Sequence, residues 1–93
     1  MDISDWRTKI DVLDETLVEL LNRRAQYALK IGEIKKANNQ PIYSPRRERT
    51  VLDKVQKLNK GPLSDDAVKG VFEKIIDESR RLEGGQAVAF GNS

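Results

Sequence analysis

Apolar residues recur at alternating steps of four and three along the first third of the chain, which is the spacing that places them on one face of an α-helix. The series consists of Trp6, Ile10, Leu13, Leu17, Leu20, Tyr27, Ile31 and Ile34. This pattern predicts a helix from about Ser4 to Ala37, ended by polar residues and a proline at 38–41. At about 1.5 Å per residue, such a helix is on the order of 50 Å long.

Two shorter amphipathic segments follow, separated by breaks that contain Asn, Gly and Pro. The first is expected to begin with Ser44 as its N-cap, with Pro45 at the first helical position, and to end at 59–62. The second is expected to begin with Ser64 as its N-cap and to stop at the glycine pair 84–85. The sequence therefore predicts an all-α fold with one long and two shorter helices.

The lengths of these helices also bear on association. Residues 1–85 form one domain in this interpretation, and residues 86–93, which show no helical period, are expected to be a disordered tail. Two short helices cover only part of a rod of about 50 Å, whereas its apolar face continues from end to end. Because a soluble monomer tolerates little exposed carbon, the pattern predicts a symmetric homodimer with the long helices paired antiparallel.

The composition restricts the chemistry and the partners. The 93 residues include no Cys and no His, which removes disulfides, the usual zinc ligands, and thiol or imidazole catalysis. Seventeen basic and fifteen acidic residues leave a formal charge of +2, too small and too evenly spread to indicate a nucleic-acid surface. With no long apolar stretch and no signal peptide, we expect a cytoplasmic protein without a membrane partner.

Two cations share the inward face of the long helix. Arg24 stands at a position where the spacing requires an apolar side chain. Burial of an unpaired charge costs roughly several kcal/mol, so its guanidinium must meet a carboxylate of the protein or an acidic ligand. Lys35 points to within about 20° of Arg24, roughly 16 Å along the same face. An ion pair for Arg24 and a solvated Lys35 are the alternatives that the pattern leaves open.

Polar residues also lie on the inward faces of the shorter helices. Ser79 and Glu83 continue the apolar stripe of the third helix, four residues apart. The first turn of the second helix holds Arg46, Arg47, Glu48 and Arg49. Three cations oppose the helix dipole there, so an anion is expected to compensate them. A charged surface turn, a packing role for Ser79 and a solvated Glu83 remain open as alternatives.

The order and spacing of these residues resemble the all-helical class of chorismate mutases. The resemblance covers roughly residues 5–83 and rests on the segments 6–11, 20–25, 31–35 and 45–49. It implies an isomerase of aromatic amino acid biosynthesis in the shikimate pathway, which converts chorismate to prephenate in an intertwined homodimer. That pericyclic rearrangement needs no nucleophile, metal or cofactor, which suits a chain without Cys and His.

The resemblance implies a role for each candidate residue in turn. Arg24 is similar to the arginine that clamps a substrate carboxylate, and Lys35 to the lysine that reaches the ether oxygen. Arg47 and Glu48 resemble the pair at the ring-hydroxyl end, where Glu48 accepts the hydroxyl's hydrogen bond. Ser44 stands where some members have an aspartate, so its contact with substrate is left open.

Three further residues complete the implied site. Ser79 resembles the hydroxyl that contacts the ring carboxylate, and Glu83 falls where the family has glutamine or glutamate beside the ether oxygen. Because a carboxylate would oppose the charge developing there, we expect Glu83 to act in its protonated form. Arg7 resembles an arginine that crosses from the other subunit. It lies 28 residues from Lys35, about 42 Å along one helix, so a small ligand can contact both only between chains.

Other functions share parts of this pattern. The nearest alternative is an isochorismate pyruvate lyase on the same scaffold. A noncatalytic helical dimer that binds a metabolite of the pathway and regulates another enzyme is an alternative from a different class. The chain is also compatible with fusion to, or association with, another enzyme of aromatic biosynthesis.

Overall fold

The computed structural model describes residues 1–85 and contains three helices, α1 (Ile3–Ala37), α2 (Pro45–Leu58) and α3 (Asp65–Glu83). The predicted all-α fold and the number of helices within this part of the chain are confirmed. The tail that we predicted at 86–93 lies outside the described residues.

The helix boundaries follow from local capping chemistry. α1 begins one residue before the predicted start, because Asp2 and Asp5 form a reciprocal capping box with bonds of 3.1 and 2.9 Å. α3 is capped as predicted by Ser64, whose hydroxyl accepts a hydrogen bond of 3.0 Å from the backbone N–H of Ala67. Ser44 occupies the N-cap position of α2, but its side chain makes no capping hydrogen bond. The Ser44 hydroxyl is therefore not engaged by the helix that it precedes.

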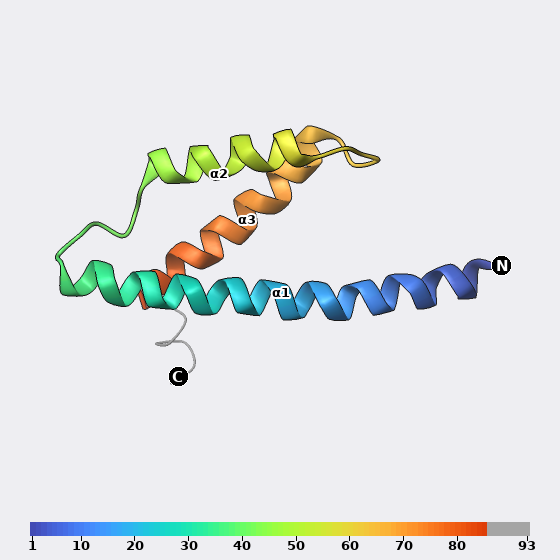
Figure 1. Ribbon diagram of the computed structural model, residues 1–93, viewed down its shortest axis with the longest axis horizontal. Coiled ribbons are helices and arrows are strands. Elements are labelled where there is room, and N and C mark those ends of the chain that lie inside the picture. The colour runs from blue at the N-terminus through green and yellow to red at the C-terminus, as the bar shows by residue number, and fades with distance from the viewer. Residues whose placement is uncertain (86–93) are drawn as a thin grey trace.

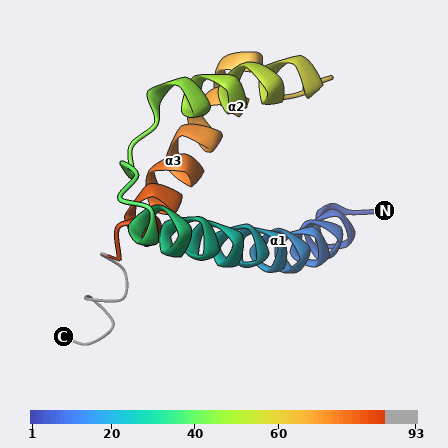
Figure 2. The same cartoon turned by 60° about the vertical axis from the view of Figure 1, so that its left-hand side comes forward.

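α3 joins the other two helices. It crosses obliquely between α1 and α2 and packs against both, as Figures 1 and 2 show. The amino-terminal part of α1, blue in Figure 1, projects beyond the other helices. One region of the molecule is surrounded by three segments, namely the carboxy-terminal half of α1, the start of α2 and the end of α3.

The apolar face of α1 is largely uncovered within one chain. Trp6, Leu13 and Leu17 retain 55%, 62% and 54% of their exposure. In the part of the chain that the structure describes, Ala28 and Ile76 are the only buried hydrophobic residues, and they retain 5% and 7% of their exposure. A single chain thus leaves most of the predicted apolar face of α1 in water.

Within residues 1–85, no helix is both long and apolar enough to span a bilayer.

A close approach between α1 and α3 occurs at Gly32, which is buried. A Cβ atom at this position would lie 2.6 Å from the carbonyl oxygen of Glu83 and 2.7 Å from its Cα. No side chain fits there without movement of the backbone. Glycine at position 32 therefore lets the end of α3, and Glu83 with it, rest directly on α1.

Candidate active site

A cavity of about 490 Å³ lies between the three helices. It brings together Arg24 and Lys35 from α1, Ser44, Arg47 and Glu48 from the start of α2, and Ser79 and Glu83 from α3. Tyr27, Ile31, Val51 and Ile76 supply apolar parts of its wall. All but one of the residues singled out from the sequence as site residues thus line a single cavity, and the exception is Arg7.

Lys35 is fixed by two acceptors and is not a solvated lysine. Its Nζ atom donates to Oε1 of Glu83 at 2.7 Å and to the carbonyl oxygen of Ile42 at 3.0 Å. The Lys35 and Glu83 side chains are 20% and 14% exposed. Because both partners are partly buried, the ammonium group is held in one place at the cavity wall.

Arg24 meets a hydroxyl rather than a carboxylate. Its Nη1 atom donates to Oγ of Ser79 at 2.6 Å, and that hydroxyl donates to the carbonyl oxygen of Ile75 at 2.9 Å. Within residues 1–85, the ion pairs do not include Arg24. The positive charge of this half-buried guanidinium is therefore available to an anion that enters the cavity.

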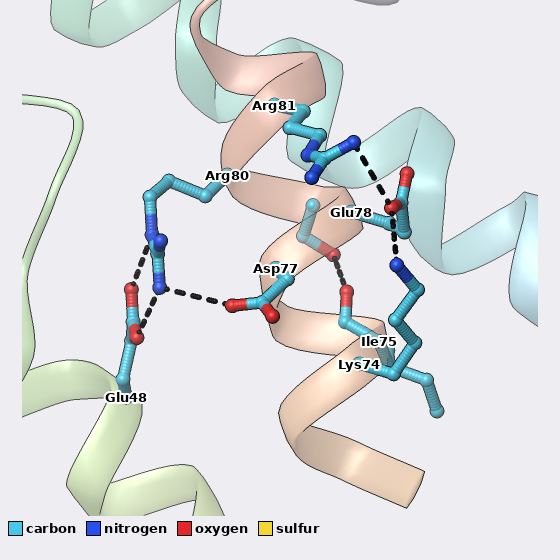
Figure 3. A network of polar contacts seen from close by, with 8 residues as sticks. Glu48, Lys74, Ile75, Asp77, Glu78, Arg80 and Arg81 are labelled. Carbon is cyan, nitrogen blue, oxygen red and sulfur yellow. Dashed lines mark hydrogen bonds and ion pairs between the residues drawn. The ribbon is translucent and has the colours of Figure 1, made fainter.

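Glu48 is engaged by a residue that the sequence analysis missed. Arg80, on α3, donates from Nε and Nη2 to the two carboxylate oxygens of Glu48 at 2.9 and 2.7 Å (Figure 3). The hydrogen bond that Arg80 donates to Glu48 raises the pKa of Arg80 above its usual value, so Arg80 remains a cation. The signal was present in the spacing, since Arg80 lies four residues after Ile76 and three before Glu83, on the inward face.

Arg7 does not reach the cavity within one chain. It lies near the amino end of α1, which begins at Ile3, and it does not line the cavity. All three arginines are exposed, but only Arg47 lines the cavity, whereas Arg46 and Arg49 do not. The arginine cluster at the start of α2 thus contributes one cation to the site. Ser44 lines it too, with a hydroxyl not used for capping.

The arrangement suits a small anion that also carries a hydroxyl group. Arg24, Lys35 and Arg47 provide donors for negatively charged oxygens, while Glu48 offers carboxylate oxygens that accept. In the described part of the chain, no three acidic side chains cluster in a way that could hold a metal ion. The groups present can bind, orient and stabilise charge.

Comparisons with known proteins converge on one family. The family model for chorismate mutase type II matches residues 6–84. The bifunctional chorismate mutase/prephenate dehydratase of Neisseria gonorrhoeae is 40% identical over 84 residues, which cover 90% of this chain but only 23% of that relative.

Two solved structures extend the likeness to the fold. Form II of the chorismate mutase from Thermus thermophilus has a TM-score of 0.88 at 28% identity and covers 90% of this chain and 96% of that one. The chorismate mutase from Helicobacter pylori in complex with prephenate has a TM-score of 0.82 at 30% identity, over 91% and 92% of the two chains.

Proposed function

Because the chain belongs to the chorismate mutase type II family, we propose that it rearranges chorismate to prephenate in the cavity between its three helices. The observation that carries this proposal is the convergence of Arg24, Lys35 and Arg47 on one cavity together with the acceptor Glu48. Chorismate is a dianion with a ring hydroxyl, which is the combination that these groups complement. The likeness to the Helicobacter pylori enzyme, which was solved in complex with prephenate, adds support.

The proposed catalysis depends on position and charge. In the rearrangement, one C–O bond breaks while one C–C bond forms within the same molecule, so neither a nucleophile nor a general base is required. Arg24 and Arg47 hold the substrate carboxylates, and Ser79 contacts the ring carboxylate. This clamp selects the folded shape in which the two reacting carbons approach each other.

Lys35 supplies the main electrostatic stabilisation in this proposal. Negative charge grows on the ether oxygen as the C–O bond breaks, and the Lys35 ammonium donates a hydrogen bond to that oxygen. Its contacts with Glu83 and Ile42 hold the donor in place before the reaction begins. Such preorganised donors contribute about 3 to 4 kcal/mol in buried sites.

The remaining part of the proposal is a shared site in a homodimer. The exposed apolar face of α1 is available to a second copy, and antiparallel pairing would bring the amino end of one α1 toward the far half of the other. We propose that Arg7 of each chain then completes the cavity of its partner. One cavity would hold cations from two protomers around one dianion.

The proposal is tested by incubating the purified protein with chorismate and following the loss of chorismate absorbance, with product separation by chromatography. Prephenate as the product supports the assignment. Release of pyruvate from isochorismate, without turnover of chorismate, would replace it with the lyase alternative. Binding of chorismate without turnover would favour the noncatalytic regulatory alternative. The bifunctional relative is consistent with a domain that works beside another enzyme of the pathway, fused or associated.

Glu83 leads to a prediction about the charge beside the ether oxygen. Its carboxyl group lies 2.7 Å from the Lys35 ammonium at the cavity wall, and a negative charge there would oppose the charge that develops on the ether oxygen. Glu83→Gln, which is uncharged and donates a hydrogen bond, is therefore expected to keep kcat at or above the wild-type value. The measurement is kcat of both proteins at one fixed pH.

Glu78→Gln is the matched control for this series. Glu78 lies on the same helix, and its hydrogen bond from Lys74 lowers the pKa of its carboxyl below the usual value. Its side chain is half exposed and does not line the cavity, so its replacement should leave kcat unchanged. A Glu83→Gln variant whose kcat falls well below that of wild type would contradict the role of Glu83 as a donor to the ether oxygen.

A further inference from the structure

Arg80 grips Glu48 in a paired arrangement. The Nε and Nη2 atoms of Arg80 each face one oxygen of the Glu48 carboxylate, at 2.9 and 2.7 Å, as Figure 3 shows. Two parallel bonds fix both the direction and the plane of the carboxylate, which a single bond cannot do. The side chains are 37% and 22% exposed, and both residues line the cavity. This contact joins the start of α2 to the end of α3 at the site.

Arg80 is itself held from two other directions. Its Nη2 atom lies 3.3 Å from Oδ1 of Asp77, one turn earlier on α3 (Figure 3). Its guanidinium carbon lies 4.9 Å from the centre of the Tyr43 ring, in the segment between α1 and α2. An aromatic face attracts a cation at this distance. Asp77 thus constrains the guanidinium at its edge, and Tyr43 constrains it at its face. Because Glu48 is bonded to this guanidinium, its carboxylate is held in place as well.

A carboxylate oxygen can accept more than one hydrogen bond. Each Glu48 oxygen therefore retains acceptor capacity after it has received a bond from Arg80. We propose that Arg80 is a positioning residue, which aims Glu48 so that it accepts the hydrogen bond of the substrate's ring hydroxyl. This inference rests on the proposed mutase function. Without Arg80, the Glu48 side chain would rotate freely and the hydroxyl would meet its acceptor only part of the time.

The test is a double-mutant cycle on chorismate turnover. Arg80→Gln is expected to lower kcat/KM by about tenfold to a hundredfold, the effect of a misplaced contact. In a Glu48→Gln background, the same change is expected to cost no more than about twofold, because residues that act through one another are not additive. Arg80→Lys keeps the charge but not the paired geometry, so it should restore only a small part of the loss.

Arg81→Gln is the matched control. Arg81 is the next residue on α3 and is 54% exposed, and its one ion pair within residues 1–85 is a long contact of 3.7 Å with Glu78. Its replacement should leave kcat/KM unchanged. Circular dichroism and the midpoint of thermal unfolding are recorded for every variant. If Arg80→Gln does not fold, the same cycle is run with Arg80→Lys.

The outcomes separate this inference from the proposed function. A wild-type protein that does not convert chorismate would contradict the proposed function. If the wild type is active and Arg80→Gln, correctly folded, matches it, the inference is wrong. If Arg80→Gln lowers kcat/KM equally in the wild-type and the Glu48→Gln backgrounds, the inference is also wrong, since Arg80 would then act on the substrate directly or through the fold. A loss confined to the background that retains Glu48 supports it.

Discussion

Replacing Lys35 with alanine is expected to lower kcat by about a hundredfold to a thousandfold, the effect of removing one preorganised donor from a developing negative charge. The change also removes the partner of Glu83, which lies 2.7 Å from the ammonium group. In its ionised form, that carboxylate would then face the ether oxygen alone and raise the barrier further. Initial rates of chorismate consumption at saturating substrate measure the effect.

Lys36→Ala is the control for this prediction. Lys36 is the adjacent residue in the last turn of α1, and it is exposed and does not line the cavity. Lys36→Ala changes the net charge and the end of the helix in the same way as Lys35→Ala. A difference in kcat between the two variants therefore reports the effect of the position of the ammonium group. A Lys35→Ala variant with the kcat of wild type would remove the proposed electrostatic mechanism.

Replacing Gly32 with alanine is expected to reduce both stability and activity. The added Cβ would lie 2.6 Å from the carbonyl oxygen of Glu83, and the obstructing atoms belong to backbone rather than to a flexible side chain. Overpacking of this kind costs about 1 to 3 kcal/mol in the free energy of unfolding. The end of α3 must move away from α1, which carries Glu83 away from Lys35, and a shift near 1 Å can lower turnover about a hundredfold.

Gly70→Ala provides the matched comparison. Gly70 lies within α3, and a Cβ there would meet no heavy atom of the described residues within 4 Å. Alanine is favoured over glycine inside a helix by about 0.5 to 1 kcal/mol, so this variant should be slightly more stable than wild type. Chemical denaturation and turnover are measured on both variants. Equal behaviour of the two would contradict the argued close contact at Gly32.

Much of the architecture could be predicted because it depends on short-range patterns. The four-and-three spacing predicted α1, and Ser64 as an N-cap predicted the start of α3. The inward position of Arg24 and Lys35 follows from helical periodicity alone, and both residues line the cavity. The roles of these residues in catalysis came from the family resemblance and stay predictions.

Other features depend on how α3 crosses the remaining helices, which no local pattern specifies. The pairing of Glu48 with Arg80 joins residues 32 positions apart, so no local spacing indicates it. The contact between Arg24 and Ser79 spans 55 positions. It pairs Arg24 with a hydroxyl, whereas the sequence analysis expected a carboxylate of the protein or an acidic ligand. The close approach at Gly32 likewise becomes apparent only when two helix backbones are placed in space.

The central claim, a cationic cavity built by two protomers, is tested most directly by mixing two inactive variants. Arg7→Ala and Lys35→Ala are purified separately, unfolded together and refolded, and chorismate turnover is compared with that of each variant refolded alone. In a mixed dimer, one cavity carries both substitutions and the other carries neither. Random pairing makes half of the dimers mixed, so the mixture should recover about a quarter of wild-type activity. A mixture as inactive as its components would contradict the claim that Arg7 serves the cavity of its partner.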